Sequence, residues 1–117
     1  MSRRLVPLLA AAALALPASA AAHTPIKSLS PSAGASADRS LGSVRVAFAG
    51  RISDANLTVR SASGRKVSRG SGTPYEGRRR VRVRLVGGLS RGSYRATVKW
   101  LSSDGHILDR SWSFRLR

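Results

Sequence analysis

The chain has 117 residues, which is enough for one domain at most, and it lacks cysteine, so disulfides and thiolate chemistry are excluded. Its 21 Lys and Arg residues against five acidic ones give a formal net charge of +16, which favours anionic partners such as nucleic acid, lipid head groups or acidic polymers. Because the few acidic residues form no clustered pair and no Ser/His/Asp constellation is present, the sequence indicates a binding protein, not an enzyme.

The first 22 residues have the pattern of an export signal. A basic start, Met1–Arg4, precedes an apolar stretch from Leu5 to Pro17 and the small residues Ala18–Ala22, which a signal peptidase accepts. The apolar stretch is too short for a transmembrane helix, and no later segment reaches the ~20 apolar residues that one needs. We therefore expect 1–22 to be a signal peptide and 23–117 to be a soluble exported domain. The arginine pair leaves both the general and the twin-arginine export routes open.

The elements predicted after the export signal are an extended arm and a series of short strands. The stretch from His23 to Ser43 is rich in Ser, Ala and Pro and has little periodicity, so it predicts an extended arm. Beyond it, apolar residues alternate with polar or basic ones, which is typical of half-buried antiparallel strands. The expected strands cover residues 44–48, 57–60, 66–68, 80–85, 94–100 and 112–117. The stretch from Gly70 to Arg78 is predicted to be a loop, and Ser103-Asp104-Gly105 a turn.

Six or seven short strands without helical spacing predict an all-β fold, namely a small immunoglobulin-like β-sandwich or Greek-key barrel of about seven strands. Trp100 and Trp112 follow the apolar alternation, so we expect both in the core. The basic stripe from Arg78 to Arg84 has only Tyr75 as a neighbouring aromatic residue. Stacking platforms are therefore lacking, and we expect a solvated face that binds anionic surfaces weakly and no specific nucleic acid.

The clearest chemistry lies with the two histidines, His23 and His106. Cleavage after Ala22 makes His23 the first residue, so that its α-amino group and its imidazole can chelate one ion together. Asp104 adds a carboxylate and His106 a second imidazole, and Gly105 between them tolerates a tight turn that lets both side chains face one point. A nitrogen and oxygen donor set, with no thiolate and no methionine outside the export signal, favours one Cu(II) ion in tetragonal coordination.

Cleavage after Ala20 is the alternative. His23 would then be the third residue, and the amine, two backbone amides and the imidazole would make a square-planar four-nitrogen site for Cu(II) or Ni(II). That site would need neither Asp104 nor His106. We favour cleavage after Ala22, because only that form unites both imidazoles and the carboxylate.

Four features of the chain can be compared with known families. They are the Ala22-His23 junction, Ser30-Pro31-Ser32-Ala33-Gly34, the strand Val44–Phe48, and a C-terminal stretch that contains Gly92-Ser93-Tyr94 and a Ser-x-Asp-Gly-His turn. With them the chain resembles the CopC family of exported copper-binding and copper-resistance proteins over nearly all of residues 23–117. The resemblance implies a small Greek-key β-sandwich. It also implies a Cu(II) site formed by His23, Asp104 and His106.

Two departures from the family pattern concern possible copper ligands. Family members often carry an acidic residue just after the first core strand, whereas this chain has Phe48-Ala49-Gly50-Arg51 there. A fourth protein ligand is therefore not identified, and water is the candidate for that position. The Met- and His-rich Cu(I) site of some members is missing.

We expect the exported chain to be a Cu(II) carrier or buffer for copper tolerance or copper supply, in the periplasm or at the outer face of the cytoplasmic membrane. The resemblance makes a membrane copper importer a candidate recipient. Two other interpretations stay open. One is a strongly basic interaction domain that binds anionic polymers or a membrane surface. The other is a copper-dependent oxidative enzyme, which the small size and the carboxylate ligand disfavour.

Overall fold

The computed structural model describes residues 23–117, and the signal peptide expected at residues 1–22 lies outside the described part. Eight strands build the described chain. In chain order they are β1 (Ile26–Ser30), β2 (Ser36–Ala37), β3 (Ser43–Phe48), β4 (Ile52–Ser61), β5 (Ser68–Tyr75), β6 (Arg80–Leu85), β7 (Gly92–Ser102) and β8 (Ile107–Leu116). Across residues 23–117 there is no helix with the length and apolar character needed to cross a membrane.

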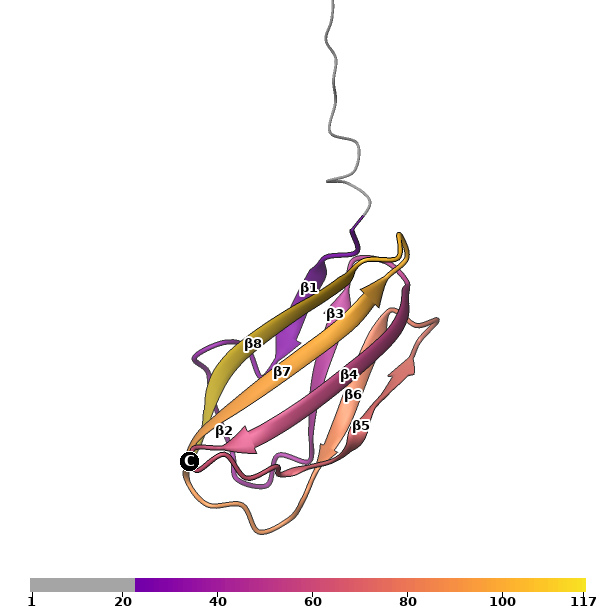
Figure 1. Ribbon diagram of the computed structural model, residues 1–117. Coiled ribbons are helices and arrows are strands. Elements are labelled where there is room, and N and C mark those ends of the chain that lie inside the picture. The colour runs from indigo at the N-terminus through magenta and orange to yellow at the C-terminus, as the bar shows by residue number, and fades with distance from the viewer. Residues whose placement is uncertain (1–22) are drawn as a thin grey trace, which may run out of the picture.

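The strands form two four-stranded sheets that pack face to face (Figure 1). One sheet has the order β1-β3-β6-β5 and the other the order β2-β8-β7-β4. All neighbouring strands run antiparallel except the two-residue β2, which pairs parallel with β8. The prediction of a small all-β sandwich is confirmed, but β1, β2 and most of β5 are not among the strands expected from the sequence.

The core lies between the sheets and is made by the inward positions of the alternating strands. Burial of these apolar side chains is the main favourable term in folding such a domain. Trp100 and Trp112 are both buried, as their alternation predicts. The inward residues of the four best-patterned strands are Val44, Val46, Phe48, Val81, Val83, Leu85, Tyr94, Ala96, Val98, Trp100, Trp112, Phe114 and Leu116.

The extended arm predicted from His23 to Ser43 contains two strands that the sequence did not indicate, β1 and β2. β1 pairs with β3, but its register shifts between Ile26 and Ser28. Ile26 and Leu29 both pack against the core, although they are three residues apart. The bulge thus removes the period of two by which a strand is recognised from sequence.

The loop predicted from Gly70 to Arg78 is wrong over most of its length, because β5 continues to Tyr75. The register of β5 on β6 shifts between Arg69 and Thr73, and the glycines within the shift have positive φ. A Cβ atom at Gly72 would lie 3.2 Å from Val81 Cγ2, and this close approach, together with a φ of +96°, favours glycine. The strand predicted at 66–68 reduces to a single bridge at Lys66 before β5 begins.

The hairpin that joins β7 and β8 lies at the same end of the sandwich as the start of β1 (Figure 1). Its turn is closed by two main-chain hydrogen bonds: Ser102 N–H donates to His106 O at 2.8 Å, and Gly105 N–H donates to Ser102 O at 2.9 Å. Gly105 has a φ of +89°, which favours glycine. The predicted turn is confirmed, and it presents Asp104 and His106 beside the beginning of the described chain.

Candidate metal centre

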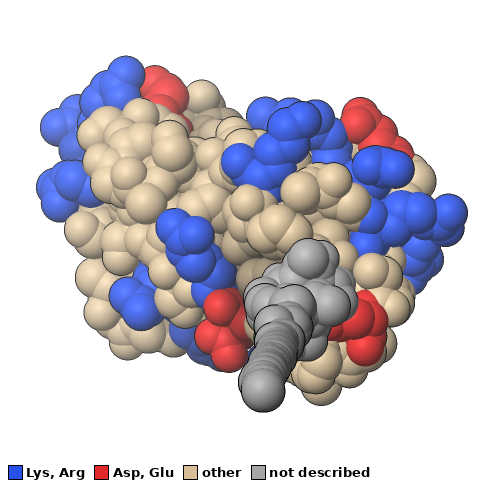
Figure 2. Space-filling model, turned by 90° about the horizontal axis from the view of Figure 1, so that it is seen from above, with Lys and Arg blue, Asp and Glu red and all other residues tan. Residues whose placement is uncertain are grey.

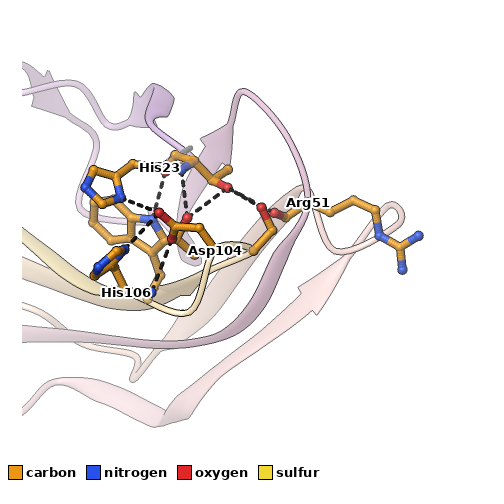
Figure 3. A network of polar contacts seen from close by, with 8 residues as sticks. His23, Arg51, Asp104 and His106 are labelled. Atoms are coloured by element: carbon orange, nitrogen blue, oxygen red, sulfur yellow. Dashed lines mark hydrogen bonds and ion pairs between the residues drawn. The ribbon is translucent and has the colours of Figure 1, made fainter. Parts of the chain in front are cut away.

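Three side chains that could hold a metal ion meet at this end of the sandwich (Figure 3). His23 precedes β1, whereas Asp104 and His106 belong to the β7–β8 turn. One ligand atom from each of the three lies within 4.8 Å of the others. Nδ1 of His23 is 2.9 Å from Asp104 Oδ2, and Nδ1 of His106 is 2.8 Å from the same oxygen. The three residues singled out in the sequence are therefore neighbours in space.

Asp104 is held as a carboxylate by its neighbour in the turn. Its Oδ2 atom accepts a hydrogen bond from Nδ1 of His106, and its Oδ1 atom accepts one from the main-chain N–H of His106 at 3.2 Å. The side-chain bond from His106 holds the pKa of Asp104 well below its usual range, against the opposing effect of burial. A charged oxygen donor is thus present at the centre of the cluster.

His23 contributes a nitrogen that makes no hydrogen bond. Nδ1 of His23 is buried and has no hydrogen-bond partner, although it lies 2.9 Å from Asp104 Oδ2. Buried polar atoms without a partner are rare in folded proteins. The two imidazole rings stand nearly perpendicular, at 89°, with centroids 4.8 Å apart. A nitrogen lone pair beside a carboxylate and a second imidazole fits a divalent metal ion.

Thr24 attaches His23 to the turn. The main-chain N–H of Thr24 donates to Ser102 Oγ at 2.8 Å, and Ser102 Oγ donates to Thr24 Oγ1 at 3.2 Å. The indole Nε1–H of Trp100 donates to Thr24 O at 2.9 Å. Thr24 and Ser102 are both buried. These bonds hold Thr24 against the end of β7, where Ser102 lies two residues before Asp104. His23 is therefore oriented toward the turn.

Sequence patterns do not reveal this supporting set. The apolar alternation places Trp100 in the core alone, and no motif singles out Thr24 or Ser102. The available signal was position, since Thr24 follows His23 and Ser102 precedes Asp104 by two residues. Contacts that span 78 residues leave no local pattern, however, and only the paired sheets bring these residues together.

Arg51 lies just after β3, in the segment where the resemblance leads one to expect an acidic residue and this chain has none. Its main-chain oxygen accepts a hydrogen bond from Thr24 Oγ1 at 3.3 Å. Its side chain is exposed and points away from the three candidate ligands (Figure 3). Arg51 therefore supports the position of Thr24 through its backbone, and its positive charge stays outside the donor set. Within residues 23–117, no further His, Cys, Asp or Glu joins the three-residue group.

The candidate centre is open to solvent. The side chains of His23 and His106 are 39% and 64% exposed, whereas that of Asp104 is 15% exposed. Seen from this end, basic side chains form separate clusters with acidic side chains between them (Figure 2). An ion held here would be reached directly from the surface, which suits exchange more than permanent structural binding.

The fold and the donor set define a small β-sandwich protein with a surface site of two imidazoles and one carboxylate. The CopC domain profile matches residues 26–117, and the chain belongs to the CopC family. The matched region includes Asp104 and His106 but begins after His23.

Two solved structures illustrate the similarity. CopC from Methylosinus trichosporium OB3b is 25% identical, with a TM-score of 0.72, over 80% of this chain and 93% of that one. PcoC, a methionine-rich copper resistance protein from Escherichia coli, is 21% identical, with a TM-score of 0.66, over 82% of this chain and 100% of that one. The second likeness concerns the fold alone. No curated protein shows significant sequence similarity to the chain.

Proposed function

We propose that the exported chain binds one Cu(II) ion through His23, Asp104 and His106, and that it serves as a copper carrier or buffer. The observation that carries this proposal is the buried Nδ1 atom of His23, which has no hydrogen-bond partner and lies 2.9 Å from the Asp104 carboxylate. Membership of the CopC family supports copper as the metal.

The donor atoms suit tetragonal coordination. Ligand atoms at neighbouring corners of such a site, each about 2 Å from the ion, stand about 2.8 Å apart. Nδ1 of His23, which makes no hydrogen bond, lies 2.9 Å from Asp104 Oδ2. Cu(II) prefers this geometry with nitrogen and oxygen donors, and it binds more tightly than the other common divalent ions. The proposal concerns Cu(II) alone, because methionine occurs only at position 1 and cysteine is absent.

Signal cleavage after Ala22 completes the donor set in this proposal. The freed α-amino group of His23 then joins its own imidazole in chelating the ion, and water takes any remaining position. The open surface position supports transfer of copper outside the cytoplasm, for tolerance or for supply. A membrane copper importer is the recipient that we propose.

Copper titration of the exported protein tests the site, once intact mass has shown which residue is first. We expect one Cu(II) per chain. His106→Ala should weaken binding by about 100-fold or more, since it removes a ligand and the hydrogen bond that orients Asp104. Ile107→Ala is the matched control, because the exposed Ile107 side chain lies next in the chain and offers no donor. Unchanged affinity in His106→Ala would contradict the proposed site.

A further inference from the structure

The outer face of the β1-β3-β6-β5 sheet carries positive charge without negative charge. The strands of this sheet contain no Asp or Glu. Glu76, just beyond β5, pairs with Arg80 at 2.8 Å. Among residues 23–117, the other four arginines of this face form no ion pair. The arginines on the face are Arg45 on β3, Arg69 on β5 and Arg80, Arg82 and Arg84 on β6.

Two pairs of these arginines stand directly opposite each other in the sheet. Arg45 is the register partner of Arg82, and Arg69 is the register partner of Arg84. Like charges in directly opposite positions destabilise a sheet. An anion that lies between the guanidinium groups removes this repulsion and gains charge-assisted hydrogen bonds.

A hollow lies beside three of these arginines. The register shift of β5 opens a space of about 260 Å³ beside β6. Arg69, Arg82 and Arg84 line it together with Thr73, and no carboxylate does. The guanidinium carbon of Arg82 lies 4.7 Å from the centre of the Tyr75 ring. This cation–π contact orients the Arg82 side chain.

The opposite sheet provides the contrast. It also has two arginines in register, Arg60 and Arg95. On that sheet, however, Lys99 is the register partner of Asp109, and Asp54 lies on β4. Basic and acidic positions are therefore mixed on the β4-β7-β8 face. The Arg60–Arg95 pair therefore serves as a control for the effect of positive charge alone.

We propose that the hollow between β5 and β6 binds a phosphate group. Guanidinium groups match phosphate oxygens with two parallel N–H donors each, and Thr73 adds a hydroxyl donor. The source of the phosphate is either a free inorganic phosphate compound or the head group of an anionic phospholipid. This site is separate from the candidate metal centre, and it does not depend on the proposed copper function.

Titration of the metal-free protein with inorganic diphosphate, followed by amide NMR shifts at about 0.15 M salt, tests the proposal. We expect saturable shifts that cluster on β5 and β6. The double variant Arg69→Gln with Arg84→Gln should bind about tenfold more weakly or worse. Arg60→Gln with Arg95→Gln removes the same charge from the other sheet and should bind as the parent does. Shifts without saturation on both sheets, or equal weakening in both variants, would overturn the proposal.

Vesicles of phosphatidylcholine with phosphatidylglycerol form the second arm of the test. A phospholipid source predicts that only the Arg69/Arg84 variant loses vesicle binding, and that diphosphate competes with the vesicles. A free phosphate source predicts that both variants bind vesicles equally, while the Arg69/Arg84 variant still binds diphosphate more weakly than the Arg60/Arg95 variant does. Thermal unfolding without phosphate checks the folded state. Both variants relieve repulsion between register partners and should unfold no earlier than the parent.

Discussion

Trp100 donates a hydrogen bond from its indole Nε1–H to the main-chain oxygen of Thr24, 2.9 Å away and 76 residues earlier in the chain. The ring itself is buried and packs against Phe48, with ring centres 5.3 Å apart. One side chain thus belongs to the core of the sandwich and also holds the residue that follows His23. This bond connects the packing of β3 and β7 to the geometry of the candidate metal centre.

Trp100→Phe should weaken Cu(II) binding by about tenfold or more, as loss of an outer hydrogen bond to a metal site does. The substitution keeps an aromatic ring in the core but removes the donor to Thr24 O, so His23 loses part of its orientation. Affinity for Cu(II), measured by competition with a chelator of known strength, is the readout.

Trp112→Phe is the control for that substitution. Trp112 is also buried, and its Nε1–H donates to Pro31 O at 2.9 Å, away from the candidate ligands. It should lower the free energy of unfolding as Trp100→Phe does, while leaving Cu(II) affinity unchanged. Equal losses of affinity in the two variants would show that general loosening of the sandwich, and not the bond to Thr24, governs the site.

How far sequence predicts this fold depends on the regularity of each strand. β3, β6 and β7 alternate for most of their length, and each was predicted close to its position in the structure, whereas only the second halves of β4 and β8 were predicted. β1 and β5 were missed because both carry a register shift, which moves side chains out of the period of two. β2 is two residues long and gives no periodic signal. Bulged strands become visible only when their partners are known.

For the candidate site, residue type and turn chemistry were sufficient to select His23, Asp104 and His106. That these three residues lie close together could be expected only if the segment at His23 were known to lie beside the β7–β8 turn. The residues that achieve this return are Thr24, Ser102 and Trp100, which are ordinary in sequence and specific only in their mutual contacts. Such a network depends on the packing of two sheets and therefore cannot be derived from local patterns.

Leu57→Ala should destabilise the sandwich by about 2–5 kcal/mol, because Leu57 is fully buried and the substitution leaves a cavity. Chemical denaturation of the metal-free protein measures the change in the free energy of unfolding. Ile107→Ala is the comparison, since the Ile107 side chain is 69% exposed and its removal should change stability little. A loss at Ile107 as large as that at Leu57 would show that Ile107 is covered in solution.

Ser40→Ala should raise the pKa of Asp38. The main-chain N–H of Ser40 donates to Asp38 Oδ1 at 2.8 Å and its hydroxyl donates at 2.7 Å, and these bonds hold the pKa of Asp38 below its usual value. A lowered folded-state pKa contributes stability above the unfolded pKa, and that contribution is lost as pH falls through the folded pKa. The parent and Ser40→Ala should therefore converge in stability at acid pH. A carboxyl NMR titration gives both pKa values, and identical values would refute the assignment.

The position of the first residue should decide which copper site forms. A protein that begins at His23 has its amine and imidazole on one residue, beside Asp104 and His106, and should bind Cu(II) with up to three nitrogens and a carboxylate oxygen. A protein that begins at Ala21 moves the amine two residues away. Its amine, two backbone amides and the imidazole of His23 then form a four-nitrogen site that needs no turn residue. His106→Ala should therefore weaken Cu(II) binding strongly in the first protein and leave it unchanged in the second. Electron paramagnetic resonance of the two copper forms counts the nitrogens. A four-nitrogen spectrum in the protein that begins at His23, insensitive to His106→Ala, would refute the three-residue site while leaving copper binding itself intact.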